Sequence, residues 1–176
     1  LLYQLMAAEA AAQNGDLGAA YVIYLKLARD TRDPRLARRA TELALQGRAL
    51  PQALDAAKLW HEVAPQTAEA SQTLAMLYAN SGQFDESYAL FSEQLKSAPR
   101  PAEELARIQR ALSRNQDRAG AFTLLERLAQ PFMSNADVRL VLASGAQAAG
   151  LTDRAAQEAR AALAIAPDSE RAALAV

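Results

Sequence analysis

Few residues in this chain could carry out chemistry. It has one histidine, His61, and no cysteine. The common zinc sites need several histidine or cysteine ligands, so one cannot be assembled from this chain alone. Cysteine-based catalysis is excluded, and a serine–histidine arrangement would need the fold to bring a serine and a carboxylate to His61. His61 follows Trp60 near the end of an expected helix, and we expect its role to be structural.

The carboxylates and glycines also favour structural roles. The pairs Asp85-Glu86 and Glu103-Glu104 fall near the starts of expected helices, where the helix dipole favours negative charge. The glycines occur singly and form no phosphate-binding loop. The sequence therefore predicts a protein that is not an enzyme and that has no cofactor and no metal site.

Composition limits the class of protein further. Hydrophobic residues make up 51% of the chain, which is enough for a continuous core, and the formal net charge is −1. A dedicated nucleic-acid-binding domain is usually basic, so we expect no nucleic-acid partner. No apolar run is long enough to cross a membrane, and no secretory signal is visible. The chain begins and ends inside helical patterns, which suggests a piece of a longer protein.

A repeat of about 34 residues organises the chain. Small residues recur every 33 or 34 positions, at Ala20, Ala53, Ser87, Ala121 and Ala155. Prolines recur at similar intervals, at Pro34, Pro65, Pro99, Pro131 and Pro167. A period of this length is typical of stacked helical hairpins. Larger residues one turn after the small ones (Tyr24, Phe91 and Leu125 among them) are expected in the core.

The helical pattern predicts five hairpins and no strands. The expected helix pairs are Leu2–Gln13 with Leu17–Asp30, Pro34–Gln46 with Leu50–Val63, Thr67–Asn80 with Phe84–Ser97, Ala102–Arg114 with Arg118–Gln130, and Ala136–Ala149 with Asp153–Ile165. These give one array with units of about 1–33, 34–66, 67–100, 101–134 and 135–167, and residues 168–176 would start a further helix. Asp33 is expected to cap the helix that Pro34 begins.

The turns within the hairpins are expected to differ. Gly15 is suited to a left-handed backbone after the first helix. The turn at Gly47 carries one extra residue, and Gln116 replaces the glycine of the fourth hairpin. The helix before Gln116 must therefore end in another way.

The third unit resembles the tetratricopeptide repeat, through Leu74-Ala75, Tyr78, Gly82-x-Phe84, Phe91 and Pro99. That family alternates small and large residues at these spacings over 34 positions. The resemblance extends over the whole chain and implies an α-solenoid, a right-handed superhelical stack of hairpins that binds other proteins. The family's tryptophan is absent from every first helix, and Trp60 lies in a second helix instead.

A second, local resemblance covers residues 28–40, with the sequence ARDTRDPRLARRA. This segment looks like part of the tetratricopeptide lipoproteins of the proteobacterial periplasm and outer membrane. Some of these are adaptors that hold carboxyl-terminal processing proteases and deliver substrates to them. The resemblance implies a bacterial periplasmic or outer-membrane location, a periplasmic protease as a candidate partner, and a lipid anchor upstream of Leu1.

The expected partner-binding surface is the concave face that the first helices form in such a stack. Helical spacing predicts that the following residues face it: Arg35, Arg38, Arg39, Glu42, Gln72, Met76, Asn80, Arg107, Arg110 and Arg114. Arginine can hold carboxylates bidentately, so an acidic or C-terminal segment of a partner is one candidate ligand. The alternative is that these arginines form a solvated face, paired with Glu42, Glu69 and Glu103. The lysine and asparagine clamp of chaperone-binding family members is not reproduced here.

The first expected helix is unusually apolar. Leu1, Leu2, Leu5 and Met6 occur where a terminal repeat should present a polar face. Preceding residues could cover this face, or it could be a docking site. The sequence therefore predicts a non-catalytic scaffold or adaptor. A structural, self-assembling module that uses this helix is the alternative, and an enzyme-associated domain is disfavoured.

Overall fold

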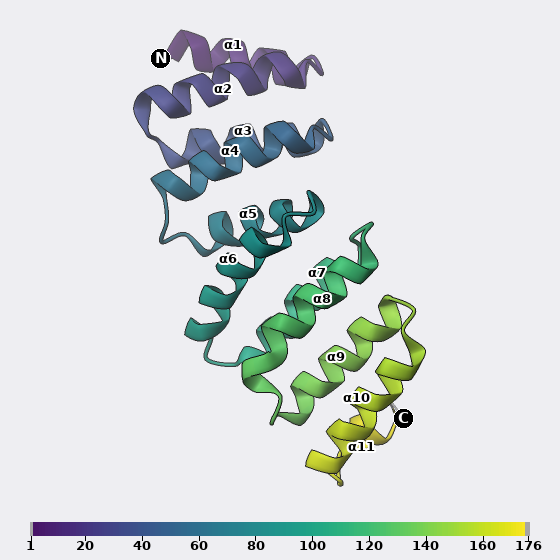
Figure 1. Ribbon diagram of the computed structural model, residues 1–176. Helices are drawn as coiled ribbons and strands as arrows, with labels where there is room; N and C mark the ends of the chain where they lie inside the picture. Colours follow the sequence, from purple (N-terminus) through teal and green to yellow (C-terminus); the bar gives the residue numbers. More distant parts are fainter. Residues whose placement is uncertain (1, 175–176) are drawn as a thin grey trace. The chain divides into compact units, whose positions relative to one another are not determined.

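The computed structural model describes residues 2–174, which form helices and turns without a strand (Figure 1). The helices are α1 (Leu2–Gln13), α2 (Leu17–Thr31), α3 (Pro34–Gln46), α4 (Leu50–Val63), α5 (Ala68–Asn80), α6 (Phe84–Ser97), α7 (Pro101–Leu112), α8 (Arg118–Ala129), α9 (Ala136–Ala148), α10 (Thr152–Ile165) and α11 (Glu170–Ala173). A single 3₁₀ turn, Gln130–Phe132, follows α8. The all-α prediction is confirmed, and the ten expected helices are present within two residues of their predicted bounds. Leu1, Ala175 and Val176, which the predictions included, lie outside the described residues.

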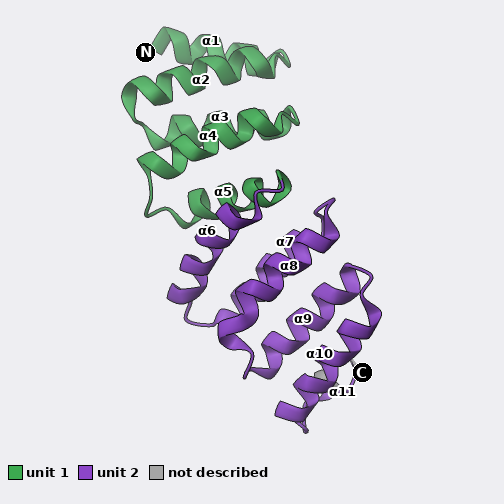
Figure 2. Cartoon of the chain, viewed as in Figure 1, with its two compact units in different colours: residues 1–81 green, residues 82–176 purple. Residues whose placement is uncertain are grey.

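The chain divides into two compact units, residues 1–81 and 82–176 (Figure 2). Unit 1 contains α1 to α5, and unit 2 contains α6 to α11. The boundary falls in the turn between α5 and α6, inside the third expected hairpin.

Polar caps and prolines fix where several helices begin. The Asp33 side chain accepts a hydrogen bond from the Arg35 amide at 2.9 Å, and Pro34 occupies the first turn of α3. Asp16 and Asp117 cap α2 and α8 through the amides of Ala19 and Gly120. These bonds satisfy amides that have no partner inside the helix, so each cap specifies a helix start.

The expected left-handed backbone occurs at Gly15 (φ 83°), but in the turn of the second hairpin the left-handed residue is not the glycine. Gly47 has a φ of −76°, and the left-handed residue is Arg48, with a φ of 54°. The amide of Arg48 donates to Leu45 O and that of Ala49 to Ala44 O, as Gly15 and Asp16 do to Ala12 and Ala11. Since α3 is one residue longer than α1, the same turn occurs one position beyond the glycine.

The fourth hairpin ends its first helix without a left-handed residue, as the loss of the glycine predicted. Buried Asn115 stabilises this turn instead: its side-chain oxygen accepts a hydrogen bond from the Asp117 amide at 2.9 Å. A side-chain oxygen thus takes the place of a special backbone conformation.

The small residues of the repeat lie where helices cross. Ala20, Ala53 and Ser87 are fully buried, and Ala121 is 5% exposed. Ala155 is half-buried instead. The larger residues predicted beside them, Tyr24, Phe91 and Leu125, are all buried. The repeat therefore marks the core, as its period indicated.

Unit 2 contains one further close helix approach that the repeat did not predict. A Cβ atom added to Gly145 of α9 would lie 2.4 Å from a methyl group of Leu125 in α8 and 3.6 Å from Cγ of Gln109 in α7. Gly145 thus allows α9 to contact both helices of the preceding hairpin.

Candidate partner-binding surface

The residues predicted to bind a partner lie on the outward sides of α3, α5 and α7. Arg35, Arg38, Glu42, Asn80, Arg107, Arg110 and Arg114 are exposed, whereas Arg39, Gln72 and Met76 are half-buried. Arg114 lies in the turn after α7 rather than on the helix. The ten residues are divided between the two units, so each group is described by itself.

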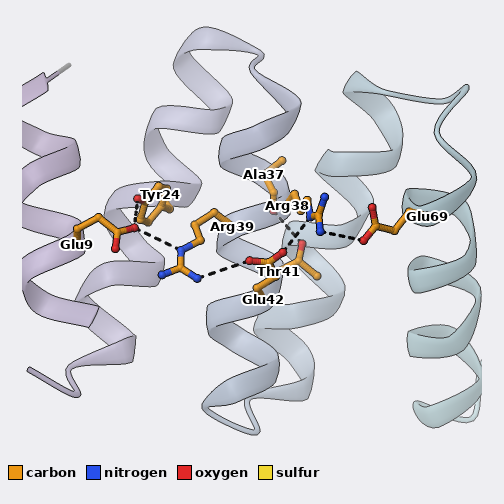
Figure 3. Close-up of polar contacts among 8 residues, drawn as sticks. All are labelled: Glu9, Tyr24, Ala37, Arg38, Arg39, Thr41, Glu42 and Glu69. Atoms are coloured by element: carbon orange, nitrogen blue, oxygen red, sulfur yellow. Dashed lines mark hydrogen bonds and ion pairs between the residues drawn. The ribbon is translucent and has the colours of Figure 1, made fainter. Parts of the chain in front are cut away.

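Arg38 and Arg39 of unit 1 belong to a ladder of ion pairs across α1, α3 and α5 (Figure 3). Arg39 contacts Glu9 at 3.4 Å and Glu42 at 3.5 Å. Arg38 contacts Glu42 at 2.9 Å and Glu69 at 3.2 Å. The guanidinium of Arg38 also lies over the ring of Trp60, 5.8 Å from its centroid. Both arginines therefore already hold carboxylates of their own chain. This agrees with the alternative prediction, in which the arginines of this face pair with Glu42 and Glu69.

The ladder ends at Tyr24, whose hydroxyl donates a hydrogen bond to Glu9 (Figure 3). This bond, together with the charge of Arg39, holds the pKa of Glu9 below its usual value. Burial, followed by the proximity of Glu9, raises the pKa of Tyr24. Glu9, which the sequence did not single out, is thus held ionised at one end of the ladder.

Arg35 lies outside the ladder and pairs with its own helix cap. Its guanidinium contacts the Asp33 carboxylate at 2.6 Å, and this hydrogen bond lowers the pKa of Asp33. Arg35 and Arg39 border an open cavity of about 450 Å³ whose apolar lining includes Leu5 and Leu36. The cavity lies wholly within unit 1.

The arginines of unit 2 differ in their pairing. Arg107 contacts Glu104 at 3.0 Å, and Glu104, which is largely buried, also accepts a hydrogen bond from Gln94. Glu103 pairs with Arg100 rather than with an arginine of the predicted surface. Among the described residues, the guanidinium groups of Arg110 and Arg114 have no ion pair and no hydrogen bond.

The histidine contacts a serine, which the sequence left open. The ring nitrogen Nδ1 of His61 in α4 lies 3.2 Å from the Ser71 hydroxyl in α5. Within the part of the chain that is described, no carboxylate bonds to His61, so the third member of a catalytic triad is missing. The hydroxyl lies near Thr67 O as well, which fits a contact between neighbouring helices.

Unit 2 contains a buried charge network that the sequence reasoning missed. Glu158 of α10 has a side chain 2% exposed and contacts Arg139 of α9 at 2.8 Å and Arg154 at 2.9 Å. Arg154 also contacts Glu126 of α8 at 2.9 Å. The i,i+4 spacing of Arg154 and Glu158 was the available signal for one of these pairs. It gave no indication that Glu158 would be buried.

Residues 2–174 contain neither a cluster of metal-ligating side chains nor a helix that could span a membrane. In that range, no three histidine, aspartate or glutamate side chains come together as metal ligands. No helix there has the length and hydrophobicity needed to span a bilayer.

The chain resembles known repeat proteins in both sequence and fold. No family model matches it. A segment of 134 residues, 76% of the chain, is 28% identical to the TPR repeat-containing protein PA4667 of Pseudomonas aeruginosa. The match spans 23% of that curated relative's length. The crystal structure of MamA protein aligns over 93% of this chain and 90% of its own, with a TM-score of 0.56 and 13% identity.

A second solved structure is described as that of a repeat protein. YrrB, described as a TPR protein with an unusual peptide-binding site, aligns over 98% of this chain and 89% of its own, with a TM-score of 0.52 and 13% identity. The chain has the tetratricopeptide-repeat fold. At 13% identity these structures establish the fold alone, whereas the local resemblance to periplasmic lipoproteins stays a prediction.

Proposed function

We propose that this chain is a non-catalytic protein-interaction scaffold, a single array of five tetratricopeptide-type hairpins that binds a partner protein or peptide through the outward faces of its first helices. One observation carries the proposal: in a fold of paired helices, α3 and α7 bury one side and present the other, with its arginines, to solvent. The peptide-binding site named for YrrB supports this use of the fold.

Photo-crosslinking tests the proposal directly. A photoreactive residue replaces Gln72, which is half-buried on α5, and the protein is irradiated in an extract of its source cells. A matched control carries the probe at exposed Lys58 on the second helix α4. We expect a discrete crosslinked protein from the first position and none from the second. Equal or absent crosslinking at both positions contradicts the proposal.

The local resemblance of residues 28–40 suggests a finer version of this function. In it, the chain is part of an adaptor anchored in the bacterial envelope by an upstream lipid, and its partner is a periplasmic processing protease. Fractionation of cells that produce the full-length protein tests the location. Recovery in the cytosolic fraction would contradict this version and leave the scaffold proposal intact.

A second candidate function is self-association through α1. Tyr3 and Met6 are 84% and 64% exposed, and Leu2 on the same helix is 73% exposed. Exposed apolar side chains of this size gather on surfaces that meet another protein. Sedimentation of the wild type and of a Tyr3→Gln/Met6→Gln variant across concentrations tests the idea. A wild type that is monomeric throughout argues against it.

A further inference from the structure

Three unpaired arginines surround the turn between α7 and α8. Arg110 lies near the end of α7, Arg114 lies in the turn, and Arg118 is the first residue of α8. The Ser113 hydroxyl donates a hydrogen bond to the carbonyl oxygen of Arg110 at 2.8 Å, and Ser113 lines a small hollow together with Arg118. Among the described residues, none of the three guanidinium groups has an ion pair or hydrogen bond. We refer to these three arginines as the basic patch.

The acidic groups nearest to the patch in the sequence are engaged elsewhere. Asp117 accepts a hydrogen bond from the Gly120 amide at 2.8 Å and so caps α8. Glu104 is held by Arg107 and Gln94, one to two turns earlier on α7. Neither of these carboxylates pairs with a guanidinium group of the patch, and the three arginines outnumber the one carboxylate, Asp117, that lies within the turn.

The arginines of unit 1 on the predicted binding surface are paired instead. Arg38 and Arg39 each contact two carboxylates of the ladder, so a ligand would have to displace Glu9, Glu42 or Glu69 to reach them. A ligand at the basic patch would break no ion pair among the described residues. The two groups of arginines that look alike in the sequence therefore differ in their capacity to bind an external carboxylate.

Partly exposed apolar side chains lie on α9, which packs against α7. Gln109, next to Arg110, approaches Gly145 of α9, as described above. Leu140 and Val141, about one turn before Gly145, are half-exposed. The surface of unit 2 thus combines unpaired guanidinium groups on α7 with accessible aliphatic carbons on α9.

We propose that the basic patch binds an acidic segment of a partner protein, with carboxylates held by Arg110, Arg114 and Arg118 and an apolar side chain against Leu140 and Val141. The inference rests on the proposed scaffold function and assigns it a ligand class and a place. Guanidinium groups favour carboxylates because they can donate two parallel hydrogen bonds. Complementary charge contributes specificity and association rate at such a surface.

Selection from a random dodecapeptide library tests the proposal on three forms of the protein. The first is wild type, and the second is Arg110→Gln/Arg114→Gln/Arg118→Gln. The third is a matched control, Lys96→Gln/Arg100→Gln/Arg160→Gln, which removes the same charge from unit 2 at positions outside the patch. Circular dichroism verifies that all three are folded, and the anisotropy of labelled selected peptides gives the affinities.

We expect the wild type and the control to select peptides rich in aspartate and glutamate with an aliphatic residue. We expect the patch variant to bind these peptides about tenfold or more weakly. Raising the salt from about 50 to 300 mM should weaken wild-type binding by a similar factor, because exposed charges are screened.

Four other results overturn the inference. Selected peptides without acidic residues, or equal affinity for the patch variant, contradict it while leaving the scaffold function standing. Tighter, patch-dependent binding of a single-stranded DNA 20-mer would assign the patch to nucleic acid instead. If no peptide is selected, the inference fails, and failure of crosslinking at Gln72 as well would remove the proposed function.

Discussion

Replacing the buried carboxylate of Glu158 should strongly destabilise unit 2. The Glu158 side chain is 2% exposed and forms ion pairs with Arg139 and Arg154. In Glu158→Gln the volume is kept, but the charge is lost and an amide N–H₂ group faces guanidinium donors. Removing one partner of a buried ion pair typically costs about 3–5 kcal/mol, because the other charge stays buried.

We expect the cost of Glu158→Gln to lie below this range, because both arginines keep other contacts. The Arg139 side chain is 25% exposed and keeps a hydrogen bond to Met133 O at 3.0 Å. Arg154 is 36% exposed and keeps its contact with Glu126. Since both arginines are partly exposed to solvent and keep one protein partner, we expect the free energy of unfolding to fall by about 2–3 kcal/mol.

Urea denaturation followed by circular dichroism measures this loss as a lower midpoint at constant slope. Glu126→Gln is the matched control, since it removes one contact from Arg154 while Glu158 remains. Its side chain is 30% exposed, so we expect a cost below about 1 kcal/mol. Equal midpoints for the two variants would refute the reasoning that burial of Glu158 sets the cost.

Four further substitutions test other parts of the structure. Ala121→Trp should cost about 1–3 kcal/mol by overpacking a helix crossing, and half-buried Ala155→Trp should cost less; neutrality of both in denaturant melts would show that the helices are out of register. Arg48→Gly should raise the stability by up to about 1 kcal/mol because it relieves a φ of 54°, whereas a lower midpoint would contradict the turn assignment. Because the pKa of Glu9 is lowered in the fold, its stabilisation is complete above the usual glutamate pKa and is lost as the pH falls through the lowered value. Glu9→Gln should therefore flatten the acid limb of the stability–pH curve by less than about 1 kcal/mol, and an unchanged limb would argue against the bond to Tyr24.

The helices could be read from the sequence because their signals are local. Asp33-Pro34 marks one helix start, and the period of small residues marks each crossing. The left-handed residue at Arg48 could not be read in this way. Its position depends on how many residues α3 contains before the turn, which the glycine alone does not determine.

The pairing of the arginines could not be derived from the sequence. Arg39 meets Glu9, 30 positions away, and Arg38 meets Glu69, 31 positions away. Helical spacing gives the face on which a side chain lies, but not the partner that a neighbouring helix brings to it. For this reason the sequence alone does not distinguish Arg38 and Arg39 of α3, which are paired with carboxylates, from Arg110 of α7, which has no ion pair among the described residues.

The ion pairs of unit 1 also bear on how its hairpins unfold. Four of them join residues of different hairpins: Glu9 with Arg39, Arg38 with Glu69, Arg29 with Asp55, and Arg32 with Glu62. In an array of repeats, the stability is the sum of each repeat's own stability and the coupling between neighbours. These pairs contribute to the coupling, and salt screens them. High ionic strength should therefore make the unfolding of unit 1 less cooperative, with neighbouring hairpins melting over a wider range of denaturant.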